Sequence, residues 1–226
     1  MRLATEAVIV LTLTGILMGL SGFLYFLIED RKDDRRRLFF KSLTNSFACL
    51  AAAFRLFSAG SFRSSRLLIF LGALCCAAAD FLLEIRFLAG VIAFGLGHLF
   101  FLGALFSFVS PGWYTWLLFL LLYAAVFLIH RKKLAAFGSL LPALLIYAAL
   151  LSLMAAAALT GLFAPRFLSP AAALVMALGG SSFFLSDNIL AWRLLHEDSK
   201  GRGWSEAILI FYYGAVYLLC AFPWFL

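Results

Sequence analysis

Long apolar stretches alternate with short charged breaks along the whole chain. A helix of about 20 residues crosses a hydrocarbon core about 30 Å thick, and the stretches are close to this length. We therefore expect each stretch to form one transmembrane helix. The eight predicted helices are Ala4 to Ile28, Ser42 to Phe57, Leu67 to Ile85, Leu88 to Val109, Trp113 to Ile129, Leu134 to Leu162, Ala171 to Leu195, and Ala207 to Leu226.

The apolar stretches are continuous and rich in Leu and Ala. Strands of a membrane β-barrel are about ten residues long and alternate in polarity, so this pattern favours helices. Composition agrees, because 65% of the residues are hydrophobic and 13% charged, outside the range of soluble globular proteins. We predict an all-α polytopic membrane protein with eight transmembrane helices in one bundle, and residues 1–226 as a single domain. The first stretch is expected to be retained, because it is too long for a signal peptide and lacks a small-x-small cleavage pattern.

Basic residues are concentrated in alternate connections between the predicted helices. Because positive charge marks cytoplasmic connections, both termini are expected to be extracytoplasmic. The net charge of +7 therefore indicates membrane topology and not nucleic-acid binding. We expect a multi-pass protein of a bacterial inner membrane. The basic residues assigned to the cytoplasmic side are Arg31, Lys32, Arg35, Arg36, Arg37, Lys41, Arg86, Arg131, Lys132, Lys133, Arg193, Lys200 and Arg202.

Polar residues interrupt three of the apolar stretches. Asp187 lies between Ser186 and Asn188, Asp80 and Glu84 are four residues apart, and His98 lies midway along its stretch. A carboxylate near the centre of a bilayer costs about 2.5 to 3.5 kcal/mol on insertion scales, so such residues usually face a protein interior or a wet cavity.

The predicted topology brings several polar residues to a common depth. Asp80 and Asp187 each lie six residues before a basic residue, Arg86 and Arg193, which places both acids in the cytoplasmic third. His98 lies somewhat deeper, near the floor of a pocket at this level. The other residues expected at the level of the acids are Lys41, Thr44, Asn45, Tyr212 and Tyr213, joined by Tyr25 and Tyr123.

Two acids that face one cavity tend to have their pKa values pushed apart, which supplies a general acid and a general base. The structural alternative is a buried hydrogen-bond network that holds the third and seventh helices together. For Glu84 the alternative is snorkelling or an ion pair with Arg86, because it lies near the interface.

Other chemistries find little support in the sequence. His130 and His196 lie in or beside cytoplasmic connections, so a His-rich zinc site with His98 is not expected. The predicted spans contain no lysine for a retinal Schiff base, and a G-x-S-x-G nucleophile motif is missing. The four cysteines fall within spans and are interpreted as packing residues. We predict no metal and no cofactor.

Several motifs, in their order and spacing, resemble the YhhN-like lysoplasmalogenases, a family of eight-helix membrane proteins. Residues 179–191, GGSSFFLSDNILA, resemble G-x-x-x-F-x-x-S-D-x-x-L-A, and residues 79–83, ADFLL, resemble G-D-x-x-L. Residues 94–101, FGLGHLFF, are similar to F-x-x-x-H-x-x-Y, with Phe101 in place of the tyrosine. Residues 41–43, KSL, resemble K-P-L, and residues 212–216, YYGAV, resemble Y-Y-x-A-Q, with Val216 in place of the glutamine.

The resemblance implies hydrolysis of the vinyl-ether bond of a lysoplasmalogen, which releases a fatty aldehyde and a glycerophospho-base. Such cleavage begins with proton delivery to an alkene carbon, so Asp80 and Asp187 are the candidate acid and base, with His98 orienting one acid or the water. Lys41 and Arg193 are expected near the phosphate. The candidate substrate-binding residues are Lys41, Asn45, Glu84, Ser186, Asn188, Tyr212 and Tyr213.

The predicted partners are a lysophospholipid substrate and the surrounding membrane lipids. Two other functions are compatible with the same polar residues. One is a non-catalytic protein that binds or transports lysolipids, and the other is a proton-coupled carrier that uses the acids as a relay.

Overall fold

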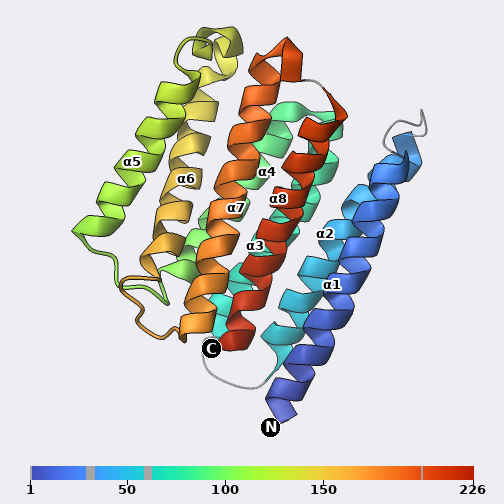
Figure 1. Ribbon diagram of the computed structural model, residues 1–226, viewed down its shortest axis with the longest axis vertical. Helices are drawn as coiled ribbons and strands as arrows, with labels where there is room; N and C mark the ends of the chain where they lie inside the picture. The colour runs from blue at the N-terminus through green and yellow to red at the C-terminus, as the bar shows by residue number, and fades with distance from the viewer. Residues whose placement is uncertain (1, 29–33, 59–62, 200) are drawn as a thin grey trace.

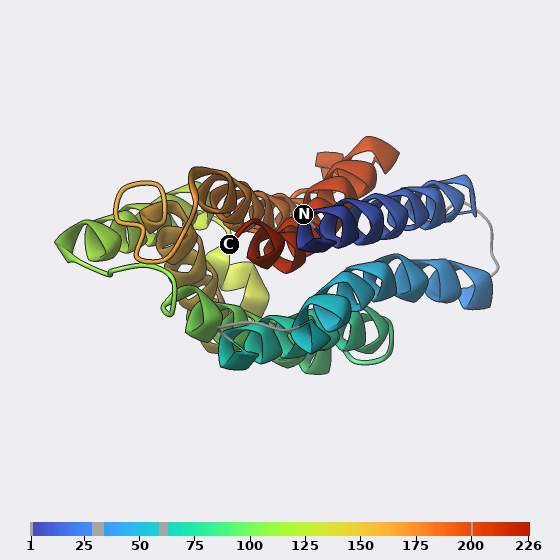
Figure 2. The ribbon, with the colours of Figure 1, turned by 90° about the horizontal axis from the view of Figure 1, so that it is seen from below.

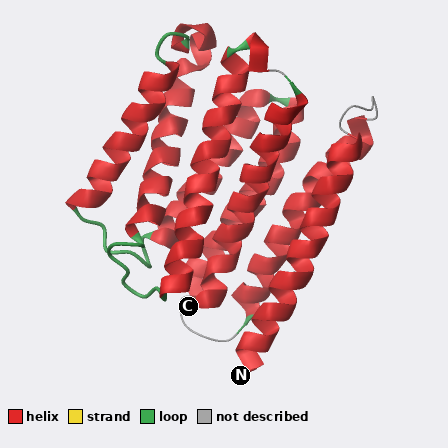
Figure 3. Cartoon of the chain, viewed as in Figure 1, coloured by secondary structure: helices red, strands yellow, loops and turns green. Residues whose placement is uncertain are grey.

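The computed structural model describes residues 2–28, 34–58, 63–199 and 201–226, which are almost entirely helical (Figure 1, Figure 3). Each predicted stretch contains one α-helix in the described residues, so the all-α prediction is confirmed. Short 3₁₀ helices η1 (Leu134–Leu140), η2 (Glu197–Ser199) and η3 (Phe222–Phe225) follow α5, α7 and α8. The α-helices are α1 (Arg2–Ile28), α2 (Asp34–Phe57), α3 (Arg63–Ile85), α4 (Phe87–Leu105), α5 (Trp113–His130), α6 (Leu141–Thr160), α7 (Pro170–Leu195) and α8 (Arg202–Ala221).

Seven helical segments of the described chain are long and apolar enough to cross a membrane, consistent with a multi-pass membrane protein. The helix outside this set is α2, which carries Lys41, Asn45 and Arg55. Asn45 and Arg55 are buried against other helices. The sequence of α2 is therefore more polar because it supplies hydrogen bonds to the interior.

Some predicted boundaries are wrong for identifiable reasons. α2 begins at Asp34 and not at Ser42, because the Arg and Leu residues between them are good helix formers. The helix predicted from Leu134 to Leu162 is interrupted at Gly138, whose φ of 51° is outside the helical range. α6 therefore begins after η1, with Pro142 in its first turn, where a missing amide hydrogen costs no helical hydrogen bond.

The remaining differences are at connections. α4 ends at Leu105 and not at Val109, and α8 begins at Arg202 and not at Ala207. Residues 29–33 of the predicted charged connection lie outside the described residues, as does Lys200.

The helices are arranged in two layers (Figure 2). α2, α3 and α4 are neighbours in one layer, and α8, α7, α6 and α5 follow one another in the other. Contacts of α2 with α8 and of α4 with α6 join the layers, while α1 packs against α2. Large apolar side chains on the outer helices, such as Leu13 of α1 and Leu121 of α5, are exposed, as expected for surfaces that face lipid.

Small residues allow close contact between helices. A Cβ atom added to Gly180 of α7 would lie 2.4 Å from the Cβ of Ala158 in α6. A Cβ on Gly97 of α4 would lie 3.3 Å from the Sγ of Cys76 in α3. Because lipid gives no hydrophobic driving force between helices, this close packing is an important source of their association.

The two ends of the bundle differ. The end that carries both termini is packed by loops 106–112 and 161–169 and by η3, and we refer to it as the closed end (Figure 1). There the amide of Ser110 donates to the carbonyl of Ala164, and the amide of Arg166 to that of Phe108, at 3.1 and 3.0 Å. The opposite end, formed by the ends of α3, α5 and α7 and the starts of α2, α4, α6 and α8, is referred to as the hollow end.

Candidate functional site

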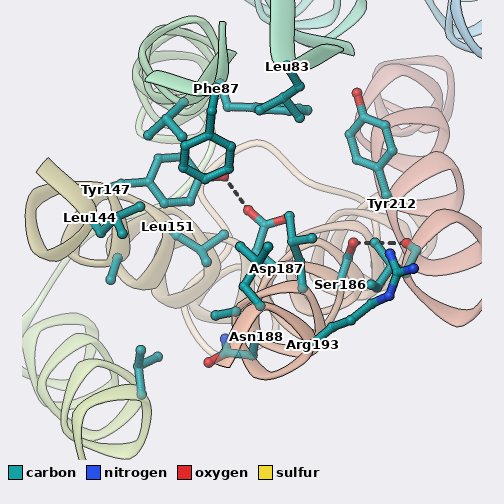
Figure 4. A pocket seen from close by; sticks show the side chains of 18 of the residues that line it. Leu83, Phe87, Leu144, Tyr147, Leu151, Ser186, Asp187, Asn188, Arg193 and Tyr212 are labelled. Carbon is teal, nitrogen blue, oxygen red and sulfur yellow. Dashed lines mark hydrogen bonds between the residues drawn. The ribbon is translucent and has the colours of Figure 1, made fainter. Parts of the chain in front are cut away.

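A cavity of about 420 Å³ occupies the hollow end between the two layers (Figure 4). This volume is within the usual range for small-molecule sites, about 300–1,000 Å³. Most of its wall is apolar, with residues such as Val91, Leu144 and Leu151 contributed by α4 and α6. Polar side chains enter the wall from both layers, among them Lys41 of α2, Asp80 of α3 and Tyr147 of α6.

Asp80 belongs to a buried network that links three helices. The Nδ2 group of Asn45 donates to Asp80 Oδ2 at 2.9 Å, and the hydroxyl of Tyr212 interacts with the same oxygen at 3.1 Å. Asn45 Nδ2 also lies 2.5 Å from the Tyr212 hydroxyl, which is 3.2 Å from the carbonyl of Cys76. Asp80 is only 2% exposed, and these contacts with α2 and α8 fix its orientation.

Asp187 belongs to a second network on the other layer. The hydroxyl of Tyr147 donates to Asp187 Oδ2, as Figure 4 shows. The Nε2 atom of His98 lies 3.0 Å from the Tyr147 hydroxyl and 3.7 Å from Asp187 Oδ2, while its Nδ1 lies 3.3 Å from the sulfur of Met154. His98 is fully buried and holds Tyr147 from behind, so α4 and α6 together orient the carboxylate of α7.

Asp80 and Asp187 line the same cavity, although they belong to helices in different layers. An aromatic cluster connects the two networks, because the ring of Phe183 lies 5.5 Å from that of Tyr212 and 4.6 Å from that of His98. Phe94 also packs edge-on against Tyr212, at 5.4 Å. The arrangement presents two fixed carboxylates to one largely apolar cavity, which suits acid–base chemistry on an amphiphile.

Lys41 and Glu84 form an ion pair in the cavity wall. Lys41 Nζ lies 2.9 Å from Glu84 Oε1, and the pair connects the start of α2 to the end of α3. For Glu84 the sequence left snorkelling or a pair with Arg86 as alternatives, and the structure provides Lys41 as a partner.

The other sequence-predicted residues are divided between the wall and its surroundings. Ser186 and Asn188 line the cavity, and their side chains donate to the carbonyls of Ile208 and Phe184 at 2.9 and 2.7 Å. Asn45 and His98 are outside the wall and contact the residues that form it. Tyr213 faces a second, smaller hollow between α1, α2 and α8, which also includes Thr44.

Three wall residues were missed as site residues or only partly recognised from the sequence. Tyr147 lies at the depth of Asp187, and its hydroxyl in an apolar helix was the available signal. His130, the last residue of α5, is only 3% exposed and neither ring nitrogen makes a hydrogen bond within the described residues. Arg193 was expected near the phosphate of a lipid but was not included among the substrate-binding residues, and its side chain lines the cavity.

The chain departs from the family motifs at Ser42, Ala79, Phe101 and Val216, and all four residues are outside the cavity wall. Phe101 and Val216 are the two departures that remove a polar side chain. Phe101 is 1% exposed, and its ring lies 3.0 Å from where a Cβ of Gly72 would be. Val216 is fully buried in the interior. Phe101 and Val216 therefore replace polar groups with packing residues away from the wall. Among the described residues, no group of three or more His, Cys, Asp or Glu side chains is placed to hold a metal ion.

Comparison with known proteins gives one informative match. Neither a curated protein nor a solved structure matches the chain. The model of the YhhN family matches residues 36–222, a range that includes both carboxylates, the residues that hold them and most of the cavity wall. This protein therefore belongs to the YhhN family.

Proposed function

We propose that this protein is a membrane-embedded hydrolase that cleaves the vinyl-ether bond of lysoplasmalogens. The observation that carries the proposal is that Asp80 and Asp187, from different layers, line one cavity with a long apolar wall. Membership of the YhhN family supports it, because the resemblance of the motifs is to the lysoplasmalogenases of that family. The substrates are 1-alkenyl-glycerophosphoethanolamine or 1-alkenyl-glycerophosphocholine.

The proposal includes an orientation in the membrane. All eight α-helices cross the inner membrane of a bacterium, both termini are extracytoplasmic, and the hollow end faces the cytoplasmic leaflet. A single-chain lipid then enters from that leaflet, with its tail against apolar residues such as Leu144 and Leu151 and its polar part toward the mouth.

The first chemical step is protonation. One carboxyl group, of Asp80 or Asp187, transfers its proton to the alkene carbon that is not bonded to oxygen. The π electrons of the alkene form the new C–H bond, and positive charge develops on the adjacent carbon and its ether oxygen. An ionised carboxylate across the cavity stabilises this oxocarbenium-like cation, because the low-polarity surroundings strengthen the interaction.

The second step is addition of water. The other carboxylate accepts a proton as the water oxygen bonds to the cationic carbon, which gives a hemiacetal. That proton then passes to the ether oxygen as the carbon–oxygen bond breaks, while the hemiacetal hydroxyl loses its proton to the first carboxylate. The products are a fatty aldehyde and a glycerophospho-base, and both carboxyl groups regain their starting states.

The residues behind the acids act as positioning residues in this mechanism. Asn45 and Tyr212 hold Asp80 in place, and Tyr147, supported by His98, holds Asp187. With both acids hydrogen-bonded to neighbours, little reorganisation is needed when charge develops on the substrate.

The test is a comparison of three lysophospholipids with the purified protein. The 1-alkenyl species is expected to release fatty aldehyde, whereas the 1-alkyl and 1-acyl species release no product. Release of fatty acid from the 1-acyl species, or no aldehyde from the alkenyl species, would reject the ether-hydrolase assignment.

A further inference from the structure

Arg193 is a cation in the cavity wall whose guanidinium makes no hydrogen bond or ion pair with another described residue. Its Nε atom is buried and has no partner. Its side chain is nevertheless in the wall, and Figure 4 shows it on the flank of α7 that carries Ser186, toward Tyr212. Arg193 is half-buried, but its Nε–H donor is buried and unsatisfied, and this costs free energy unless an acceptor binds there. The position of the side chain therefore favours an anionic ligand in the cavity.

The direction of the side chain supports this interpretation. An arginine near the end of a membrane helix normally extends to the interface and keeps its charge in water. Side chains on a helix lean toward its N-terminus, and the C-terminal end of α7 is at the hollow end. Arg193 therefore leans back toward Ser186 and into the cavity (Figure 4).

Lys41 is the other Lys or Arg side chain in the described wall, and its charge is balanced by an ion pair with Glu84. Its Nζ lies 2.9 Å from Glu84 Oε1. An anion that binds Lys41 must compete with this carboxylate, whereas an anion that binds Arg193 displaces no protein group. A guanidinium also presents paired N–H donors that match the oxygens of a phosphate.

The spacing along α7 fits a glycerophosphate. Arg193 is six residues after Asp187, which is about 9 Å along the helix axis. In a 1-alkenyl lysophospholipid, six bonds separate the vinyl carbon that receives water from the phosphorus atom. Six bonds of about 1.5 Å span roughly 7 Å when extended, which is shorter than the axial spacing of the two backbone positions. Because the Arg193 side chain leans back toward Ser186, a substrate at Asp187 can still place its phosphate near the guanidinium.

Building on the proposed function, we propose that Arg193 binds the phosphate of the lysolipid and that the site therefore selects alkenyl lipids that carry a phosphate. The Lys41–Glu84 ion pair flanks the head group but does not provide the principal phosphate contact. In this proposal, the separation of the Asp187 and Arg193 side chains matches the separation of the ether and the phosphate in the substrate.

The experiment compares two substrates with and without phosphate. Aldehyde release from 1-alkenyl-glycerophosphoethanolamine and from 1-alkenylglycerol is measured for the wild type and for Arg193→Gln. We expect kcat/KM to fall about 10- to 100-fold for the phosphate-containing lipid and less than about twofold for the alkenylglycerol. Arg202→Gln is the control, because Arg202 is at the same end of the bundle and pairs with Glu206 at 2.7 Å.

Two results would overturn the inference. Arg193→Gln could reduce cleavage of both substrates equally, which would mean a structural role, or it could leave both unchanged. Arg193→Lys is the second variant if Arg193→Gln does not fold, because lysine keeps the positive charge but loses the paired N–H donors. We expect a smaller loss of kcat/KM in this variant, confined to the phosphate-containing substrate.

A binding measurement separates this inference from the proposed function. The saturated 1-alkyl-glycerophosphoethanolamine and 1-alkylglycerol have no vinyl group to protonate. If the wild type releases no aldehyde from any lipid, the proposed function is wrong. Weaker binding of the 1-alkyl phospholipid alone to Arg193→Gln would still support a phosphate site, and unchanged or equally weakened binding of both would refute it.

Discussion

The closed end and the hollow end of the bundle are built from the same helices but use their polar groups differently. At the closed end, polar side chains bind backbone or hydroxyl groups, as when Arg55 Nε donates to the carbonyl of Pro223 at 2.8 Å and Thr160 donates to Thr115 at 3.1 Å. At the hollow end, polar side chains converge on two carboxylates beside a cavity. The first arrangement joins the ends of helices, and the second fixes the positions of the two carboxylates beside the cavity.

Aromatic packing shows the same difference. Phe108 and Phe222 are fully buried at the closed end, with ring centroids 5.4 Å apart in an edge-to-face contact. At the hollow end, Phe87 and Leu83 line open volume (Figure 4). The bundle therefore concentrates tight packing at one end, which keeps the two layers in register while the other end remains open. Substitutions at the two ends should separate stability from activity.

The largest expected effect is at the hollow end. Asp80→Asn and Asp187→Asn each remove a proton-transfer group while keeping a side chain of similar shape, so aldehyde release should fall about 1,000-fold. Binding of a 1-alkyl lysophospholipid should change by less than about threefold, since a neutral amide still fills the wall. Rates of aldehyde release and lipid titrations check this.

The matched control for these variants is Glu206→Gln, an acidic residue at the same end that pairs with Arg202. It should retain wild-type turnover. Equal losses of binding and turnover in the aspartate variants would favour the non-catalytic lysolipid protein over the hydrolase.

At the closed end the expected effect is on stability. Phe108→Ala removes a fully buried ring that contacts Phe222, and should lower the free energy of unfolding by about 3–5 kcal/mol. Activity per folded molecule should remain near that of the wild type. Thermal unfolding in detergent, with activity normalised to the folded fraction, measures both.

Phe163→Ala is the control for Phe108→Ala, since Phe163 is 71% exposed at the same end. It should leave the unfolding temperature almost unchanged. A specific loss of activity in folded Phe108→Ala would show that the closed end contributes directly to the chemistry.

An intermediate effect is expected where α6 and α7 touch. Gly180→Ala places a methyl group 2.4 Å from the Cβ of Ala158, which overpacks the contact and should cost about 1–3 kcal/mol of stability. In Gly214→Ala the added methyl has no atom within 4 Å, so this variant should be neutral or slightly stabilising. Similar unfolding temperatures for the two variants would contradict the close contact.

The smallest expected effect concerns the support of Asp187. Tyr147→Phe removes the hydroxyl that lies between His98 and the carboxylate, so kcat should fall about tenfold, equivalent to about 1.4 kcal/mol, with KM nearly unchanged. Tyr114→Phe, which removes a hydroxyl at the closed end bound to the carbonyl of Ser110, is the control and should keep wild-type kcat. A change in KM alone would mean that Tyr147 binds substrate and does not position the acid.

Much of the fold followed from the sequence because hydropathy marks helices that must satisfy their backbone within lipid. The depth of Asp80 and Asp187 relative to the next basic residue also predicted that both would reach one cavity. α2 was less clear, because the residues that lower its hydropathy are partly those that it buries.

Rotation of each helix about its axis was harder to predict than depth. Tyr212 and Tyr213 are adjacent, so they point about 100° apart, and only Tyr212 lines the cavity. Nothing in the local sequence distinguishes the two, since the choice depends on how α8 packs against α2 and α7. For the same reason, the inward direction of Arg193 and the contact of Tyr147 with Asp187 required the structure.

The contact between Gly180 and Ala158 also determines how far apart α6 and α7 lie at the hollow end. At that contact almost no side chain separates the backbones of α6 and α7. Nearer the mouth of the cavity, the side chains of Tyr147 and Asp187 lie between the two helices. The helices therefore diverge along their length, and their angle sets the width available to a lipid tail. Relatives with larger residues at this crossing should admit thicker or branched chains without any change in the residues that perform the reaction.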